Sequence, residues 1–169
     1  MKMVSEKIRD LEALYVRHLR MLLSAEELIS IKTPFLADST SDAECREVFL
    51  KHALNSRAQA GHIRAMLEHI TSDSDPLKCQ AAYALFDESE DLVKDASHDE
   101  VRNAVLIAAA QRVNHYETAM YESTAHYAKL LGRAEDARIL EAISEDERRE
   151  EQRLHALADR INGTAKRAA

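Results

Sequence analysis

Residues 101–131, VRNAVLIAAAQRVNHYETAMYESTAHYAKLL, decide the fold class of this chain. The stretch contains neither glycine nor proline and is followed at once by Gly132, which is typical of one uninterrupted helix with a glycine cap. Steps of three or four residues place six of its side chains on one helix face: Ile107, Ala110, Asn114, Glu117, Tyr121 and Ala125. An asparagine and a glutamate therefore fall within the face that should be buried.

The composition extends this interpretation to the whole chain. Its 169 residues are 46% apolar and 31% charged, with only three glycines and two prolines, which favours long helices over a sheet. This length suits one domain with a sizeable core, so we expect residues 1–169 to form a single all-α domain with a core over about residues 5–161.

Turn and capping signals divide the chain into helices. Residues 41–44 and 97–100 have the capping-box pattern, and Asp75 followed by Pro76 can start a short helix. Pro34 predicts an end or a kink in the first helix. The expected elements are four long helices and one short crossover helix, over about residues 5–34, 41–70, 76–94, 97–131 and 134–161.

Acidic residues recur on the predicted inward faces of the other long helices. Glu26 follows Leu22 in the apolar stripe of the first helix, and Glu147 and Glu151 precede Leu154 in the last. Carboxylates are rarely buried unless they are paired or bound to metal, so this placement predicts a metal site inside the bundle. Oxygen ligands with histidines nearby favour iron or manganese.

The second long helix is polar at the same level, and the chain carries a weak internal repeat. The predicted inward face of this helix includes His52, Asn55 and Gln59. Glu26 precedes Asn55 by 29 residues, and Glu117 precedes Glu147 by 30. Two similar hairpins joined by a crossover would bring these positions together about a pseudo-twofold axis.

One run of residues carries a resemblance to a known family. Residues 108–117, AAAQRVNHYE, resemble the third-helix signature of the YciE/YciF-type ferritin-like stress proteins. The similarity extends over about residues 8–160 and includes Ser24, Ala25, Glu26, Pro34, His52, Gln59, Lys78, Cys79 and residues 145–147. The resemblance implies a ferritin-like four-helix bundle with an added crossover helix, a homodimer and a carboxylate di-metal centre.

Carried over onto this chain, the resemblance also implies particular ligands. The implied metal ligands are Glu26, Glu117, Glu147, Glu151 and Gln59. Asn55 and Asn114 stand where the family usually has glutamate. An amide offers one neutral oxygen and cannot act as a charged bridge between two cations, so Asn55 predicts a weakened site with one metal or none.

The acidic residues also have interpretations without metal. Glu26 can pair with His52 or with an amide across the bundle, and a buried carboxylate that is paired needs no cation. Glu147 and Glu151 belong to the charged run of residues 145–151, which can lie in solvent with lateral ion pairs. This alternative is stronger for Glu151 than for Glu147.

The polar residues have similar alternatives. Asn55, Gln59 and Asn114 can form a hydrogen-bonded network that fixes the register of the helices, and we favour this role over ligation for the two asparagines. We expect Tyr121 to pack its ring in the core with its hydroxyl near Glu117, and a redox role is the less favoured alternative.

Charge and cysteine usage exclude several classes of function. A formal charge of −7 and a pI near 5.6 argue against a nucleic-acid binder. Cys45 and Cys79 are isolated in the sequence and indicate neither a zinc motif nor a disulfide framework. Charges interrupt the first residues and no later run is apolar enough to cross a membrane, so we expect a soluble cytoplasmic protein.

Two functions remain open at this point. The first is a ferritin-like metal protein that binds iron or manganese and oxidises Fe(II) with oxygen or peroxide. The second is a metal-free structural or stress-associated dimer of the same family, in which a polar network fills the former site. Metal content distinguishes the two functions, because oxidase chemistry needs open positions on a redox metal.

Overall fold

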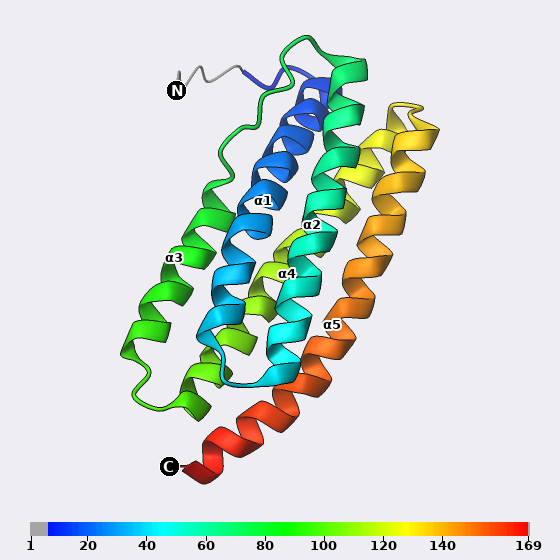
Figure 1. The fold of residues 1–169 in the computed structure, drawn as a ribbon. Coiled ribbons are helices and arrows are strands. Elements are labelled where there is room, and N and C mark those ends of the chain that lie inside the picture. Colours follow the sequence, from blue (N-terminus) through cyan, green and yellow to red (C-terminus); the bar gives the residue numbers. More distant parts are fainter. Residues whose placement is uncertain (1–6, 169) are drawn as a thin grey trace.

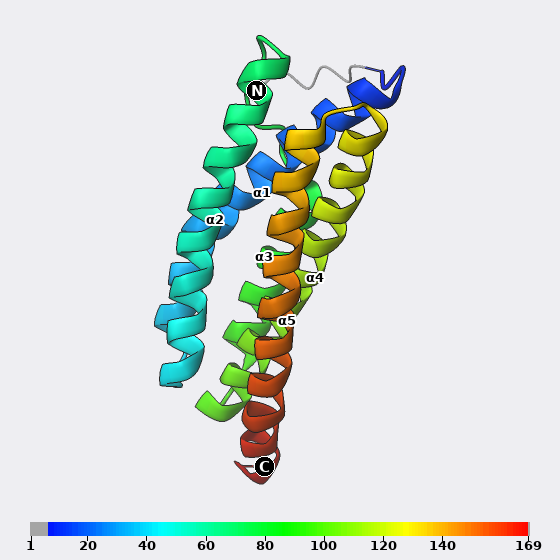
Figure 2. The same ribbon diagram turned by 90° about the vertical axis from the view of Figure 1, so that its right-hand side faces the viewer.

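The computed structural model describes residues 7–168, which form five helices and, within that range, no strand. The helices are α1 (Leu11–Ser39), α2 (Ala43–Ile70), α3 (Gln80–Asp95), α4 (Asp99–Leu130) and α5 (Ala134–Ala168). α1 packs along α2 and α4 packs along α5, so the bundle consists of two helical hairpins (Figure 1). Figure 2 shows the two hairpins side by side. The predicted bundle of four long helices with a crossover helix is confirmed.

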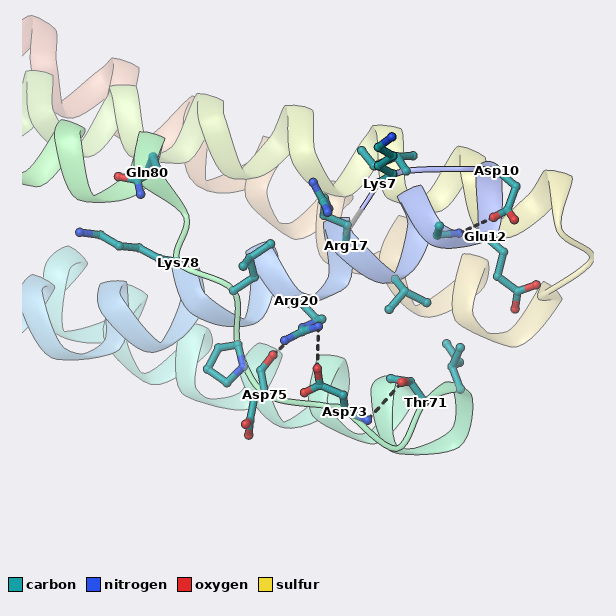
Figure 3. A pocket seen from close by; sticks show the side chains of 16 residues that line it. Lys7, Asp10, Glu12, Arg17, Arg20, Thr71, Asp73, Asp75, Lys78 and Gln80 are labelled. Carbon is teal, nitrogen blue, oxygen red and sulfur yellow. Dashed lines mark hydrogen bonds and ion pairs between the residues drawn. The ribbon is translucent and has the colours of Figure 1, made fainter. Parts of the chain in front are cut away.

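The crossover runs back along α1 before α3 begins. The Leu77 N–H donates to the Arg20 carbonyl oxygen at 3.0 Å, and Arg20 Nε donates to the Asp75 carbonyl oxygen at 2.7 Å. Arg20 also pairs with Asp73 at 3.1 Å (Figure 3). These contacts hold the chain extended past Pro76, so the prediction that α3 starts there is wrong, and the helix starts at Gln80.

The start and end of α1 differ from the sequence prediction. The predicted start near Ser5 lies outside the described residues; within them the helix starts at Leu11, and the Asp10 carboxylate accepts from the Ala13 N–H at 2.8 Å. Pro34 lies inside the helix, which continues to Ser39. Leu36, beyond the proline, is buried in the core, so packing outweighs the single backbone hydrogen bond that Pro34 removes.

Both predicted capping boxes are displaced by one residue. Asp42, not Ser41, caps α2, because the Ser41 hydroxyl accepts a hydrogen bond from Asn103 Nδ2 at 3.0 Å. α4 starts after His98, not after Ser97. The predicted left-handed cap after α4 is confirmed at Gly132, whose φ is 71°.

The last helix is longer than predicted. α5 does not stop near Ile161 but continues to Ala168 through Gly163, and Figure 1 shows its C-terminal turns extending beyond the other long helices. Nothing in the backbone at Gly163 requires a left-handed conformation, because Gly132 is the only glycine in the described range with positive φ. A glycine with helical dihedrals weakens a helix without ending it.

The buried interior has three parts along the bundle axis. One apolar cluster includes Ile29, Phe49, Ile107 and Leu154, and the other includes Leu19, Ile63, Ala125 and Leu140. Between them, every long helix contributes buried polar residues. This polar layer consists of Glu26, Ser56, Gln59, Asn114, Glu117 and Glu147, with His52 and Tyr121 at its borders.

Asp42 combines a helix cap with an ion pair between helices. Its carboxylate accepts from the Cys45 N–H at 3.0 Å and from both terminal nitrogens of Arg160 on α5 at 2.8 Å. The hydrogen bonds from Arg160 and Cys45 and the charge of Arg160 hold the pKa of Asp42 at about 2 although partial burial opposes this shift. The contribution to stability is therefore present above the usual aspartate pKa and is lost as the pH falls through about 2.

We expect Asp42→Ala to lower the free energy of unfolding by about 1–2 kcal/mol at pH 7, because it removes the cap and the ion pair. The difference from wild type should shrink as the pH approaches 2. Urea denaturation across this pH range measures the effect. Asp38→Ala is the control, because Asp38 is exposed and its ion pair with Arg46, at 3.4 Å, lies on the surface. An equal loss in both variants would contradict the assignment to the Asp42 contacts.

Candidate functional site

The polar layer brings together three carboxylates from three helices. Glu26 on α1 and Glu117 on α4 are completely buried, and Glu147 on α5 is 4% exposed. Each lies on a buried helix face that is apolar toward both ends of the bundle, so the helical period that fills the core also places the acids in its middle. The prediction that these three glutamates point inward is confirmed.

Glu147 is held by amide groups from two neighbouring helices. Gln59 Nε2 donates to its Oε1 at 2.8 Å, and Asn114 Nδ2 donates to its Oε2 at 2.8 Å. Asn114 Nδ2 also lies 3.1 Å from the Glu147 carbonyl oxygen. Asn114 therefore acts as a support for a carboxylate in this structure, as the hydrogen-bond interpretation of the sequence predicted.

Glu26 and Glu117 have different partners from those expected. The Tyr121 hydroxyl donates to Glu26 Oε1 at 2.6 Å rather than to Glu117. His52 Nε2 lies 3.2 Å from Glu117 Oε2, so the histidine pairs with Glu117 rather than with Glu26. The expected place of the Tyr121 hydroxyl beside Glu117 was wrong, and the partner of Glu26 is neither His52 nor an amide, because the sequence defines which residues share a layer but not which side chains touch within it.

Burial and mutual repulsion shift the pKa values of the layer. Burial raises the pKa of Glu26 well above its usual range, and the charge of Glu117 raises it further. Burial, with the charge of Glu117, raises the pKa of Glu147 to about 7. Burial lowers the pKa of His52, but the charge and hydrogen bond of Glu117 and the charges of Glu147 and Glu26 together outweigh burial and raise this pKa to about 10. Without a cation, the layer is therefore most stable when it holds protons on Glu26 and His52.

Several oxygens of the layer have no hydrogen-bond donor among the described residues. They are Glu26 Oε2, Glu117 Oε1, Gln59 Oε1, Asn114 Oδ1 and the Ser56 hydroxyl, whereas Glu117 Oε2 has the ring of His52 at 3.2 Å. A buried polar atom without a partner costs about 1–3 kcal/mol, and a charged one costs more. These unpaired oxygens fit a bound hard cation, because such an ion takes oxygen ligands.

Ligand atoms of His52, Glu117 and Glu147 all lie within 4.8 Å of one another. A cation among them would contact side chains from α2, α4 and α5. The charges of the same three residues also shift the pKa of Glu26 on α1. His52 was not among the metal ligands that the family resemblance implied. In the structure it has the position of a ligand.

Asn55 does not belong to the site. It is exposed, and Ser56, which is completely buried, points inward in its place. His62, which the same helical steps from Asn55 and Gln59 would place inward, is exposed, whereas Ile63 is buried. The predicted stripe of α2 was therefore one residue out of register in its middle. The apolar residue Ile63 was the signal that could have corrected it.

The corrected register changes the internal repeat. Glu26 precedes Ser56 by 30 residues, the same interval that separates Glu117 from Glu147. Ser56 thus stands in the first hairpin where Glu147 stands in the second. The residues three positions later are Gln59 and Glu150. Glu150 is buried and its Oε1 has no donor among the described residues, so it is an acidic position that the sequence analysis missed.

Glu151, predicted as a ligand of the bundle, lies outside the polar layer. Its side chain is 29% exposed, and its Oε1 lies 3.5 Å from Nδ1 of the exposed His115. Since Glu147 and Glu150 already occupy the inward positions of this turn, Glu151 projects toward the surface between α4 and α5. Its assignment as an inward residue was wrong.

One cavity of the molecule borders the polar layer, and a larger groove does not. A cavity of about 20 Å³ reaches His52 between apolar residues that include Phe49 and Phe86, so one edge of the layer borders an apolar cavity. A larger groove, about 1010 Å³, is lined by the crossover and the start of α1 (Figure 3). Its charges are mixed, because Lys7 and Arg20 line it together with Asp73, and none of the polar-layer residues lines it.

A bundle of two helical hairpins joined by a crossover, with buried carboxylates on three helices at one level, defines a ferritin-like helical protein. The chain belongs to the family described as Domain of unknown function (DUF892), whose profile matches residues 10–169. It is 32% identical over 165 residues to Protein YciF of Escherichia coli (strain K12), covering 95% of this chain and 96% of YciF. The resemblance to YciE/YciF-type proteins is thereby confirmed.

Two solved structures share the fold. The crystal structure of the E. coli stress protein YciF matches with a TM-score of 0.86 at 30% identity, covering 92% of this chain and 99% of that one. YcfI from Rhodopseudomonas palustris matches with a TM-score of 0.85 at 22% identity, covering 89% of this chain and 96% of that one. Within residues 7–168, none of the helices is long and apolar enough to span a membrane.

We expect Tyr121→Phe to lower the free energy of unfolding of the chelator-treated protein by about 1–3 kcal/mol, because buried Glu26 loses its one hydrogen-bond donor. Urea denaturation at pH 7 measures the change. Tyr127→Phe is the matched control, since Tyr127 lies on the same helix and is only partly buried. Similar losses in the two variants would show that the hydroxyl of Tyr121 has no special role.

Proposed function

We propose that the polar layer binds one divalent cation, iron or manganese, and that the protein is a metal-binding member of the YciF-type stress proteins. The proposed ligands are Glu26, Glu117 and Glu147, with His52 completing the set and Gln59 beside it. The observation that carries the proposal is the completely buried Glu117, because its Oε1 has no hydrogen-bond donor among the described residues and the partner of its Oε2 is the ring of His52, at 3.2 Å.

The energetics of burial support a cation over an empty layer. Three carboxylates in one buried layer repel one another, and the single charge of His52 compensates only one of them. Burial, and after it the charge of Glu117, raises the pKa values of Glu26 and Glu147. A divalent cation would replace the protons and supply the partner that the free oxygens lack.

The residues favour one cation rather than two. Two divalent ions would bring four positive charges to three carboxylates, and Ser56 gives no carboxylate where the repeat has Glu147. A bridge between two metals needs a charged bidentate group, and a serine hydroxyl is neither. The second hairpin, with Glu117 and Glu147, therefore holds the stronger half of the site.

The donor set determines what the site can do. Carboxylate and amide oxygens with one imidazole suit iron or manganese better than zinc or copper. Bound iron would supply one-electron chemistry toward oxygen or peroxide, which is the oxidant-handling role that we propose. Gln59 and Asn114 orient Glu147, Tyr121 holds a proton against Glu26, and the apolar residues around His52 limit water.

A metal-free structural role is the second candidate. Both oxygens of Glu147 already accept amide hydrogen bonds, so this part of the layer is satisfied without a cation. The amide donors are Gln59 and Asn114, and Ser56 adds a neutral side chain to the layer. In this role the layer would fix the register of the helices, and the protein would act through its surface.

We also propose that the protein forms a homodimer through the outer face of α1 and α2. Four large apolar side chains are exposed on these two packed helices: Ile31, Phe35, Leu50 and Leu54. Ile31 is 71% and Leu54 is 67% exposed. A concentration of large apolar side chains on one pair of helices is typical of a contact surface, and a second copy would present the same surface.

We expect the chelator-treated protein, loaded anaerobically with Fe(II) or Mn(II) and desalted, to retain close to one metal per chain and to melt at a higher temperature than the unloaded protein. Glu147→Gln should lose at least about tenfold in affinity, because removing even a supporting group of a metal site costs roughly 10–100-fold. Elemental analysis and thermal unfolding measure the two effects. Glu151→Gln is the matched control on the same helix and should retain the metal.

A gain-of-ligand variant tests the stoichiometry. Ser56→Glu adds the carboxylate that the first hairpin lacks, so we expect retention to rise from one metal toward two, whereas Asn55→Glu adds an exposed carboxylate and should change nothing. If the wild-type protein retains no metal while remaining helical by circular dichroism, the metal proposal is wrong and the structural role stands.

We expect the wild-type protein to have the mass of a dimer in light scattering, and Phe35→Glu to shift it toward the monomer, because a buried charge would disfavour the apolar contact. Leu130→Glu is the control, since Leu130 is 63% exposed but lies at the end of α4. A monomeric wild type, or a dimer that both variants leave intact, would rule out this surface.

A further inference from the structure

A second group of potential ligands lies on the surface between α4 and α5. His115 on α4 and Glu151 and His155 on α5 each have a ligand atom within 4.8 Å of those of the other two. Both histidines are exposed and Glu151 is partly exposed. We call these three residues the surface triad. None of them belongs to the polar layer.

We propose that the surface triad is a binding site for a borderline divalent metal of the zinc type, separate from the buried layer. Two imidazoles and one carboxylate are a typical ligand set of three-residue zinc sites, with further positions open to water. Hard ions such as Mg²⁺ and Ca²⁺ prefer oxygen ligands and would not select this group.

The hydrogen bond of His155 prepares its ring for a metal. Its Nδ1 lies 2.9 Å from the Glu151 carbonyl oxygen. A carbonyl oxygen only accepts hydrogen bonds, so Nδ1 carries the proton, and the lone pair of the neutral ring is at Nε2. Metal-bound histidines commonly donate their other ring nitrogen to such a carbonyl, which fixes the tautomer and the ring orientation.

The charge pairing around Glu151 leaves its carboxylate available. The neighbouring arginines pair with other acids: Arg148 with Glu122, Arg149 with Asp146 and Arg153 with Glu150. Among the residues that the structure describes, the ion pair recorded for Glu151 is the one with His115, at 3.5 Å. Glu151 lies in a run rich in arginine, yet its carboxylate points at His115 instead of at an arginine. A metal shared by the two side chains would need this orientation.

The arrangement also explains the spacing of the triad. Glu151 and His155 are four residues apart on one helix, so they lie on the same face one turn apart. His115 comes from α4, which packs along α5, and its ring centroid lies 6.1 Å from that of His155. A metal at this position would link the two helices of the second hairpin on their outer side and would stabilise their pairing.

Titration with Zn²⁺ in a calorimeter tests the proposal on the chelator-treated full chain. The Glu147→Gln background weakens the buried layer while leaving all three surface ligands unchanged. We expect one zinc per chain in this background and a higher melting temperature with zinc. His115→Gln and His155→Gln should each lower the zinc affinity at least about tenfold, in line with the sensitivity of metal sites to their surroundings.

His126→Gln is the matched control, because His126 is an exposed histidine on α4 outside the triad. It should bind zinc as the background protein does. The absence of zinc binding, or an equal loss in all three histidine variants, would overturn the proposal. Nitrogen NMR of the histidine rings adds a direct measurement, because zinc should shift Nε2 of His155 and leave the ring of His126 unchanged. These outcomes do not depend on whether the buried layer holds iron or manganese.

Discussion

The burial of three carboxylates in one layer is the constraint on which the rest of this structure depends. Glu26, Glu117 and Glu147 come from helices in both hairpins, so the bundle can close only if each acid finds a proton, an amide or a cation. The apolar clusters on either side close the layer off from solvent and make any unpaired charge costly. The two apolar clusters stabilise the bundle, whereas the polar layer determines the register in which the four long helices pack.

The two hairpins contribute different polar residues to this layer. The second hairpin retains both Glu117 and Glu147, whereas the first retains Glu26 but has Ser56 and Gln59 on α2. One half is thus suited to hold a cation and the other to donate hydrogen bonds. An amide that donates to a carboxylate fixes the orientation of that carboxylate. Gln59 of the first hairpin therefore orients Glu147, which is the proposed ligand from the second hairpin.

The sequence was sufficient to predict the helices and the inward position of the acids, because a period of 3.6 residues is a local property. It placed Glu26, Glu117 and Glu147 correctly. It failed on α2, where Asn55 and Ser56 are both polar and the period could be continued through either. It also could not show that Tyr121 reaches Glu26 or that His52 reaches Glu117, since side-chain partners depend on how the helices are rotated against each other. The displaced ends of α1 and α3 have the same origin, in contacts between distant segments.

The crossover, which is hydrogen-bonded to α1, also affects the order in which the bundle can assemble. Within each hairpin the partners are close in sequence, so α1 with α2 and α4 with α5 can pair early by local contacts. The polar layer forms only after the chain from Thr71 to Cys79 has turned back and brought the second hairpin onto the first. Contacts of large sequence separation carry the greater loss of chain entropy. We therefore expect the docking of the hairpins to be slower than the formation of either hairpin, so that the polar layer is complete only after docking.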